Sequence, residues 1–144
     1  MRYLRTNESM CRGVRACMRI CAQTFYKTDD TSYSAIQVTE KPDGSMKITV
    51  CTQCGVCIDI CPTQALSRNK LGVVMLDKKK CIGCFMCVGF CPEDAFFQHP
   101  KLPYPIKCTA CGQCPKVCPH HALEIADVNL STHAKEVTTL RLAQ

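Results

Sequence analysis

The 144-residue chain is short enough for one compact domain and too short to hold a row of cofactors together with a separate catalytic domain. Its 15 cysteines, 6% aromatic residues and lack of tryptophan leave little material for a large hydrophobic core, so we expect bound metals to stabilise the fold. The sequence opens without the apolar stretch of a signal peptide and contains no membrane-length apolar run, so we expect a cytoplasmic chain with reduced thiols and no membrane insertion.

An internal repeat starts near the N-terminus, and its template is C-x2-C-x2-C-x3-C-P followed after two residues by alanine and an apolar residue. Motif 1 (residues 11–22) is altered: it has Cys11, Cys17 and Cys21, but Val14 replaces the second cysteine and Ala22 replaces the proline. Three complete copies follow. Their cysteines are Cys51, Cys54, Cys57 and Cys61 in motif 2, Cys81, Cys84, Cys87 and Cys91 in motif 3, and Cys108, Cys111, Cys114 and Cys118 in motif 4.

The segments between the motifs are short and rich in β-forming residues. Residues 45–50 and 72–76 flank motif 2 and are predicted to be its hairpin strands. Residues 35–38, followed by a turn at 41–44, and residues 122–125 are predicted to be the equivalent strands of the outer motifs. Residues 100–105 link motif 3 to motif 4 in an extended form, and the tail, residues 127–144, is either a surface helix or a partner-docking arm.

The cysteine spacing has a mechanical reason. Two residues between cysteines let a tight loop wrap three corners of an iron–sulfur cubane, and Gly55, Gly83 and Gly112 permit the unusual backbone dihedrals. The fourth cysteine lies on a short helix that leaves the loop, so in this motif it ligates the other cluster of a pair. A zinc ribbon needs only two separated cysteine pairs, so three complete copies predict 4Fe-4S clusters rather than zinc.

The net charge of +6 is consistent with iron–sulfur clusters. An oxidised 4Fe-4S cluster with its four thiolates carries about −2, so three clusters bring the total charge near zero. A zinc-dependent nucleic-acid-binding module, which rests on the basic charge alone, is the weaker alternative, and we expect no nucleic-acid partner. The three lysines at residues 78–80 are either a solvated surface or a docking patch for an acidic external electron carrier.

Four such motifs in one short chain resemble the four-cluster iron–sulfur subunits of molybdenum and tungsten oxidoreductases, and related subunits of hydrogenases and carbon monoxide dehydrogenases. Within that family the chain is most similar to the small subunits of tungsten aldehyde oxidoreductase-type enzymes, including class II benzoyl-CoA reductase. The resemblance covers residues 5–125 and implies an α+β fold of two nested dicluster ferredoxin-like units, motif 1 with motif 4 and motif 2 with motif 3. The single domain would span residues 1–126, with an outer unit at about 1–47 and 100–126 and an inner unit at about 48–99.

Crossed ligation within these pairs implies three complete 4Fe-4S sites. The expected ligand sets are Cys51, Cys54, Cys57 with Cys91; Cys81, Cys84, Cys87 with Cys61; and Cys108, Cys111, Cys114 with Cys21. The altered site retains Cys11, Cys17 and Cys118. It is expected to be empty, with a 3Fe-4S cluster or a zinc ion bound by the three thiolates plus water or His120 as the other outcomes.

The resemblance implies an electron-transfer subunit that carries electrons to or from the tungsten or molybdenum cofactor of a larger oxidoreductase subunit. The sequence shows no nucleophile and base pair, no phosphate-binding loop and no dinucleotide fingerprint, so the chain is predicted to be non-catalytic. A free soluble ferredoxin is the alternative. Surface positions are expected for the histidines His99, His120, His121 and His133. Shielding of the inner clusters is expected from Ile58, Ile60, Phe85, Val88 and Phe90.

Overall fold

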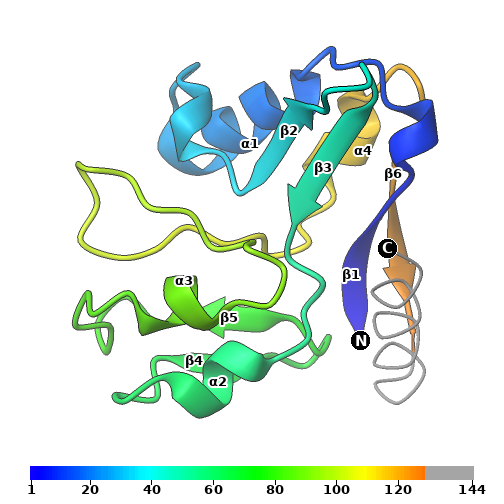
Figure 1. The fold of residues 1–144 in the computed structure, drawn as a ribbon. Helices are drawn as coiled ribbons and strands as arrows, with labels where there is room; N and C mark the ends of the chain where they lie inside the picture. Colours follow the sequence, from blue (N-terminus) through cyan, green and yellow to red (C-terminus); the bar gives the residue numbers. More distant parts are fainter. Residues whose placement is uncertain (129–144) are drawn as a thin grey trace.

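The computed structural model describes residues 1–128, which form an α+β fold of short helices and short strands (Figure 1). The strands are β1 (Arg2–Thr6), β2 (Ile36–Glu40), β3 (Met46–Val50), β4 (Leu66–Arg68), β5 (Val74–Leu76) and β6 (Leu123–Asp127). The α-helices are α1 (Ala16–Tyr26), α2 (Val56–Ile60), α3 (Met86–Phe90) and α4 (Gln113–Val117), and the 3-10 turns are η1 (Glu8–Met10) and η2 (Thr31–Tyr33). No helix among these residues is long and apolar enough to cross a membrane. The tail for which we considered a docking arm lies, from residue 129 on, outside the described residues.

Within residues 1–128 the strands form three antiparallel pairs, β1 with β6, β2 with β3, and β4 with β5. Strand β1 was not predicted from the sequence, and its pairing with β6 places the N-terminus beside the strand that follows motif 4. The expected strand at 45–50 forms as β3, but its assignment to the hairpin of motif 2 is wrong. Ile48 pairs with Val38 and Val50 pairs with Ile36 of β2, and all four are buried in the outer core, so β3 joins the outer motifs instead.

The described residues bury two separate apolar cores. Helix α1 packs against α4, and α2 packs against α3, so the helices of motifs 1 and 4 and those of motifs 2 and 3 are neighbours. The outer core includes Leu4, Met18, Ile36, Val38 and Leu123. The inner core includes Leu66, Val74 and Phe96, and Figure 1 shows it below the outer one. The arrangement confirms the predicted α+β fold of two nested units.

Each α-helix of the described part starts directly after a residue in the left-handed conformation. These residues are Arg15, Gly55, Phe85 and Gly112, with φ values of 63°, 85°, 57° and 83°. A second left-handed residue lies two positions earlier in every motif, at Gly13, Gln53, Gly83 and Ala110. Motif 1 therefore keeps the backbone shape of a cluster-binding loop, although Val14 occupies the position of its second cysteine.

Ala22 explains why α1 is longer than the other helices. In motifs 2, 3 and 4 the helix ends immediately before the fourth cysteine, and the proline that follows cannot continue it. Helix α1 runs on through Cys21 and Ala22 to Tyr26, and Ala22 is completely buried. From the sequence, Ala22 was only a departure from the template. In the structure, the alanine in place of proline allows a longer helix.

The extra turn of α1 carries an aromatic stack. The rings of Tyr26 and Tyr33 lie 5.0 Å apart, and Tyr33 stacks on His99 with a centroid distance of 3.8 Å. The expected surface position of His99 is wrong, because this stack buries it and its Nδ1 accepts the amide N–H of Lys101 at 3.1 Å. The stack joins the end of α1 to the loop between motifs 3 and 4. His120 and His121 are exposed as expected, and His133 lies outside the described residues.

Replacing Ala22 by proline tests the contribution of the extended helix. Proline removes a helical hydrogen bond and clashes with the preceding turn, so Ala22→Pro should lower the free energy of unfolding by about 3 kcal/mol. Arg19→Ala, at an exposed position of the same helix, is the control and should change it by less than about 0.5 kcal/mol. Thermal unfolding of the iron-loaded protein measures both. Equal melting temperatures for the two variants would show that the extension is dispensable.

Candidate iron–sulfur sites

Cysteines of motifs 2 and 3 approach each other where α2 packs on α3. The thiol of Cys57 interacts electrostatically with those of Cys51 and Cys54 in its own motif and with Cys87 of motif 3. Cys51 also interacts with Cys54 and with Cys91, the last cysteine of motif 3. The structure therefore brings Cys91 to the group formed by the first three cysteines of motif 2.

The cysteines of motif 3 form a second group in the inner unit. Cys87 interacts with Cys81 and Cys84. Cys61 lies at the C-cap of α2, where its sulfur accepts the amide N–H of Ala65 at 3.3 Å. The role of Cys61 as the fourth ligand of this group stays a prediction.

The outer unit gathers cysteines from the two ends of the chain. Cys114 interacts with Cys108 and Cys111 of motif 4 and, from motif 1, with Cys17 and Cys21. Cys21 in turn interacts with Cys111. Contact between α1 and α4 thus brings the last cysteine of motif 1 to the first three of motif 4.

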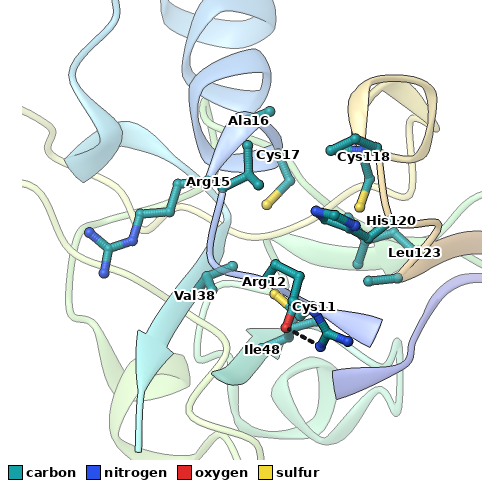
Figure 2. Close-up of a pocket in the computed structure, with 13 residues that line it drawn as sticks. Cys11, Arg12, Arg15, Ala16, Cys17, Val38, Ile48, Cys118, His120 and Leu123 are labelled. Atoms are coloured by element: carbon teal, nitrogen blue, oxygen red, sulfur yellow. Dashed lines mark hydrogen bonds between the residues drawn. The ribbon is translucent and has the colours of Figure 1, made fainter. Parts of the chain in front are cut away.

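The remaining cysteines of motifs 1 and 4 surround the altered site, where Cys17 interacts with Cys11 and Cys118. Figure 2 shows these three side chains and the His120 ring around one pocket, which Val14 also lines. Val14 is 45% exposed, and the cysteines at the same loop position in the other motifs, Cys54, Cys84 and Cys111, are exposed too. The second position of each loop therefore faces solvent, and in motif 1 it supplies no ligand.

Within residues 1–128, no three histidine, cysteine, aspartate or glutamate side chains lie close enough together to bind a single metal ion. A tetrahedral zinc site needs ligands about 2.0–2.3 Å from one ion. A cubane makes no such demand, because each of its four thiolates binds a different iron atom.

Backbone amides point at the sulfurs in a repeated pattern. The last cysteines of three motifs each accept the N–H of an alanine that precedes a strand or extended segment. These pairs are Ala35 to Cys21, Ala65 to Cys61 and Ala95 to Cys91, at 3.3, 3.3 and 3.4 Å. The first cysteines Cys51 and Cys108 accept the N–H groups of Gln53 and Ala110, both at 3.3 Å. Such bonds stabilise negative charge on sulfur, as the ligands of an iron–sulfur cluster require.

Burial makes the free thiols weak acids. It raises the pKa of Cys17 and Cys87 to about 11 and the pKa of Cys57 and Cys108 to about 12, and neighbouring thiols add to the increase. The thiolate is the form that ligates metal, so cluster binding has to release these protons. Without iron the buried cysteines are neutral at pH 7 and therefore poor nucleophiles.

A hydrogen-bonded network of polar side chains joins the inner and outer units. Gln53 is completely buried, donates from Nε2 to the Cys108 carbonyl at 2.9 Å, and accepts the N–H of Val74 at 3.0 Å. Arg68 donates to the carbonyl of Gln53 at 2.9 Å, and Lys107 donates to the side chain of Gln53 at 3.1 Å. These residues were missed by the sequence analysis. The repeat gives no signal for them, because their partners are distant in sequence and lie partly on the main chain.

The shielding of the inner clusters stays a prediction. Phe90 is 63% exposed and is not among the residues of the inner core. Ile58, Ile60, Phe85 and Val88 are half-buried.

Comparison with known proteins agrees with this geometry. Residues 50–95 match a 4Fe-4S dicluster domain, and residues 108–122 match a 4Fe-4S binding domain. The thiosulfate reductase electron transfer subunit PhsB of Salmonella typhi is 30% identical, and the alignment covers 87% of this chain and 75% of that protein. The chain belongs to the family of ferredoxin-like 4Fe-4S electron-transfer subunits.

Other members of this ferredoxin-like family differ in length. An uncharacterized ferredoxin-like protein of Escherichia coli, YdhX, is 32% identical over 81% of this chain, and the chain spans 61% of its length. Among solved structures, a chain of the active-site complex BamBC of benzoyl-coenzyme A reductase, in complex with benzoyl-CoA, aligns with a TM-score of 0.50 and 18% identity. The alignment covers 98% of this chain and 89% of that one, so the fold is shared over nearly the whole length.

Crossed ligation in the inner unit can be tested with two cysteines of the same motif. Cys61→Ser should perturb the electron paramagnetic resonance signal of the cluster held by motif 3, because the fourth cysteine leaves the loop of its own motif. Cys57→Ser should perturb the cluster held by motif 2. Cys87→Ser identifies the signal of motif 3 independently. If Cys61→Ser and Cys57→Ser change the same signal, ligation is not crossed.

Proposed function

We propose that this chain is a non-catalytic subunit that moves single electrons through three 4Fe-4S clusters to or from the cofactor of a larger oxidoreductase subunit. The observation that supports this most is the gathering of cysteines from distant motifs, above all the approach of Cys21 to Cys111 and Cys114. The clusters supply reversible one-electron redox chemistry. Where four cysteines ligate a cluster, no iron position is open to a substrate.

The chain's own residues hold and insulate the proposed clusters. The proposed ligand sets are Cys51, Cys54, Cys57 and Cys91; Cys81, Cys84, Cys87 and Cys61; and Cys108, Cys111, Cys114 and Cys21. Amide N–H groups such as those of Ala35 and Ala95 would stabilise the anionic sulfurs. Buried apolar side chains such as Ile36 and Val74 would exclude water and keep the local dielectric low.

We propose a tungsten or molybdenum enzyme as the partner, with an aldehyde oxidoreductase or a class II benzoyl-CoA reductase as examples. The resemblance of the four motifs supports this class, and the shared fold with a chain of the BamBC complex is consistent with it. Purification from the native source, followed by analysis of the complex for tungsten and molybdenum, tests the proposal. A chain that elutes alone would favour the free-ferredoxin alternative.

The isolated chain should accept electrons without turning over organic substrates. Dithionite should reduce it by about three electrons per chain, one for each cluster. With viologen dye as acceptor or donor, neither an aldehyde nor benzoyl-CoA should be converted until the larger subunit is added. Conversion of either compound by the purified small chain alone would contradict the non-catalytic role.

The altered site is proposed to be empty, which leaves three clusters. Its loop keeps the left-handed residues Gly13 and Arg15, but Val14 at the solvent-facing corner cannot ligate iron. A cubane with one unligated corner tends to lose that iron or the whole cluster. An empty site is compatible with electron transfer if it lies off the path between the other clusters.

Iron analysis of the chain and of its Val14→Cys variant tests this site. The chain should contain about twelve irons, four for each of three clusters, and show no 3Fe-4S signal when oxidised. Val14→Cys restores the second cysteine on a loop that already has the required backbone shape, so it should raise the content to about sixteen irons. About sixteen irons in the unmodified chain, or a strong 3Fe-4S resonance, would show that the altered site is occupied.

A further inference from the structure

Lys107 is a buried cation whose described partners are all uncharged. The residue is 8% exposed. Its Nζ donates to Gln53 Oε1 at 3.1 Å, to the Val74 carbonyl at 2.7 Å and to the Cys108 carbonyl at 2.7 Å. Three acceptors match the three N–H donors of an ammonium group. No carboxylate is among the partners that the described residues provide for it.

A buried ammonium without an anionic partner is costly, because the apolar interior solvates charge far less well than water does. Neutral carbonyl oxygens satisfy the N–H donors but bring no net negative charge. The anions that could compensate this charge are the proposed clusters, each of which carries about −2 with its thiolates when oxidised. The charge of Lys107 would otherwise remain uncompensated in the described part of the chain.

The position of Lys107 links it to two of the proposed clusters. It directly precedes Cys108, the first cysteine of motif 4, and it bonds Gln53, which lies between Cys51 and Cys54 of motif 2. Its ammonium group also interacts electrostatically with the side chains of Cys51, Cys57 and Cys108. Cys51 and Cys108 also interact with each other, so the inner and outer units approach at this point.

We propose that the buried ammonium of Lys107 raises the reduction potentials of the two clusters between which it lies, those assigned to motif 2 with Cys91 and to motif 4 with Cys21. The inference rests on the proposed electron-transfer function and adds a residue that sets the driving force where electrons pass between the units. A cluster gains one negative charge on reduction, so a nearby positive charge stabilises the reduced form more than the oxidised form. The low dielectric around Lys107 makes this difference larger than a surface lysine could produce.

Gln53 offers a way to change this charge without removing the lysine. Gln53→Glu places a carboxylate oxygen where the amide oxygen already accepts from Lys107 Nζ and from the Val74 amide, so it offsets the ammonium with almost the same shape. The variant loses the hydrogen bond that Gln53 Nε2 donates to the Cys108 carbonyl. Lys107→Met removes the charge but keeps a flexible apolar chain of similar length. Lys79→Met removes an exposed lysine close in sequence to Cys81, where solvent screens the charge, and serves as the control.

Redox titration of the iron-loaded chain, followed by electron paramagnetic resonance, measures each cluster separately. Both Lys107→Met and Gln53→Glu should make reduction of the two flanking clusters at least tenfold less favourable, a fall of about 59 mV for a one-electron step. In these two variants the reduction potential of the cluster assigned to motif 3 should fall by less. In Lys79→Met the potentials of all three clusters should change by less than those of the flanking clusters do in Lys107→Met.

The possible results of this titration distinguish an effect of the Lys107 charge from an effect of Lys107 on the structure. If iron content stays complete and both variants shift no more than Lys79→Met, the inference is wrong. A lower reduction potential in Lys107→Met but not in Gln53→Glu would assign Lys107 a structural role and overturn the inference. Loss of iron from both variants, with unchanged potentials in the clusters that remain, would do the same. If only Lys107→Met loses iron, the reduction potentials of the two flanking clusters in Gln53→Glu decide whether the inference holds. Absence of clusters from the unmodified chain would instead refute the proposed function.

Discussion

Three cysteine side chains separated by two residues each can face one centre only if the backbone between them turns through the left-handed region. The structure makes that turn twice in every motif, and several positions are not glycine, including Arg15, Gln53, Phe85 and Ala110. A non-glycine residue in this region costs about 1–2 kcal/mol. The loops therefore depend on interactions that hold them in place, and metal–thiolate bonds are the strongest available, so cluster binding and folding are coupled.

Packing alone gives these loops limited support, because cysteines make up part of both cores. Cys17 and Cys114 belong to the outer core, and Cys57 and Cys87 belong to the inner core. Longer-range main-chain bonds close the molecule around them. The amide of Arg2 donates to the Leu71 carbonyl at 2.8 Å, and the N-terminal amine donates to the Val128 carbonyl at 2.7 Å. The first strand thus ties the outer unit to the inner hairpin, and loss of one cluster would weaken contacts in both units.

The sequence predicted what a motif determines locally and missed what depends on distant partners. The repeat was sufficient to predict short helices after the loops and the left-handed turns at Gly55, Gly83 and Gly112, and the resemblance to a known family implied the two nested units. The repeat was not sufficient to assign β3 to β2, because both units contain short strands of similar composition. The burial of His99 depends on Tyr33, which lies far from it in sequence. Lys107 and Gln53 were missed for the same reason, since hydrogen bonds between the two units position them.

Under crossed ligation, the altered motif 1 can lose its own cluster and still supply a ligand to the cluster of motif 4. Under the proposed ligation each motif contributes three positions to one site and its last cysteine to another, so Val14 affects only the site of Cys11, Cys17 and Cys118. Cys21, on the same loop, would still complete the site of motif 4. Helix α1 starts at this loop and buries Met18 and Ala22 in the outer unit, so packing of the helix still supports the loop although its own site is proposed to be empty. A motif that has lost a ligand can therefore remain necessary, both to the fold and to the neighbouring cluster.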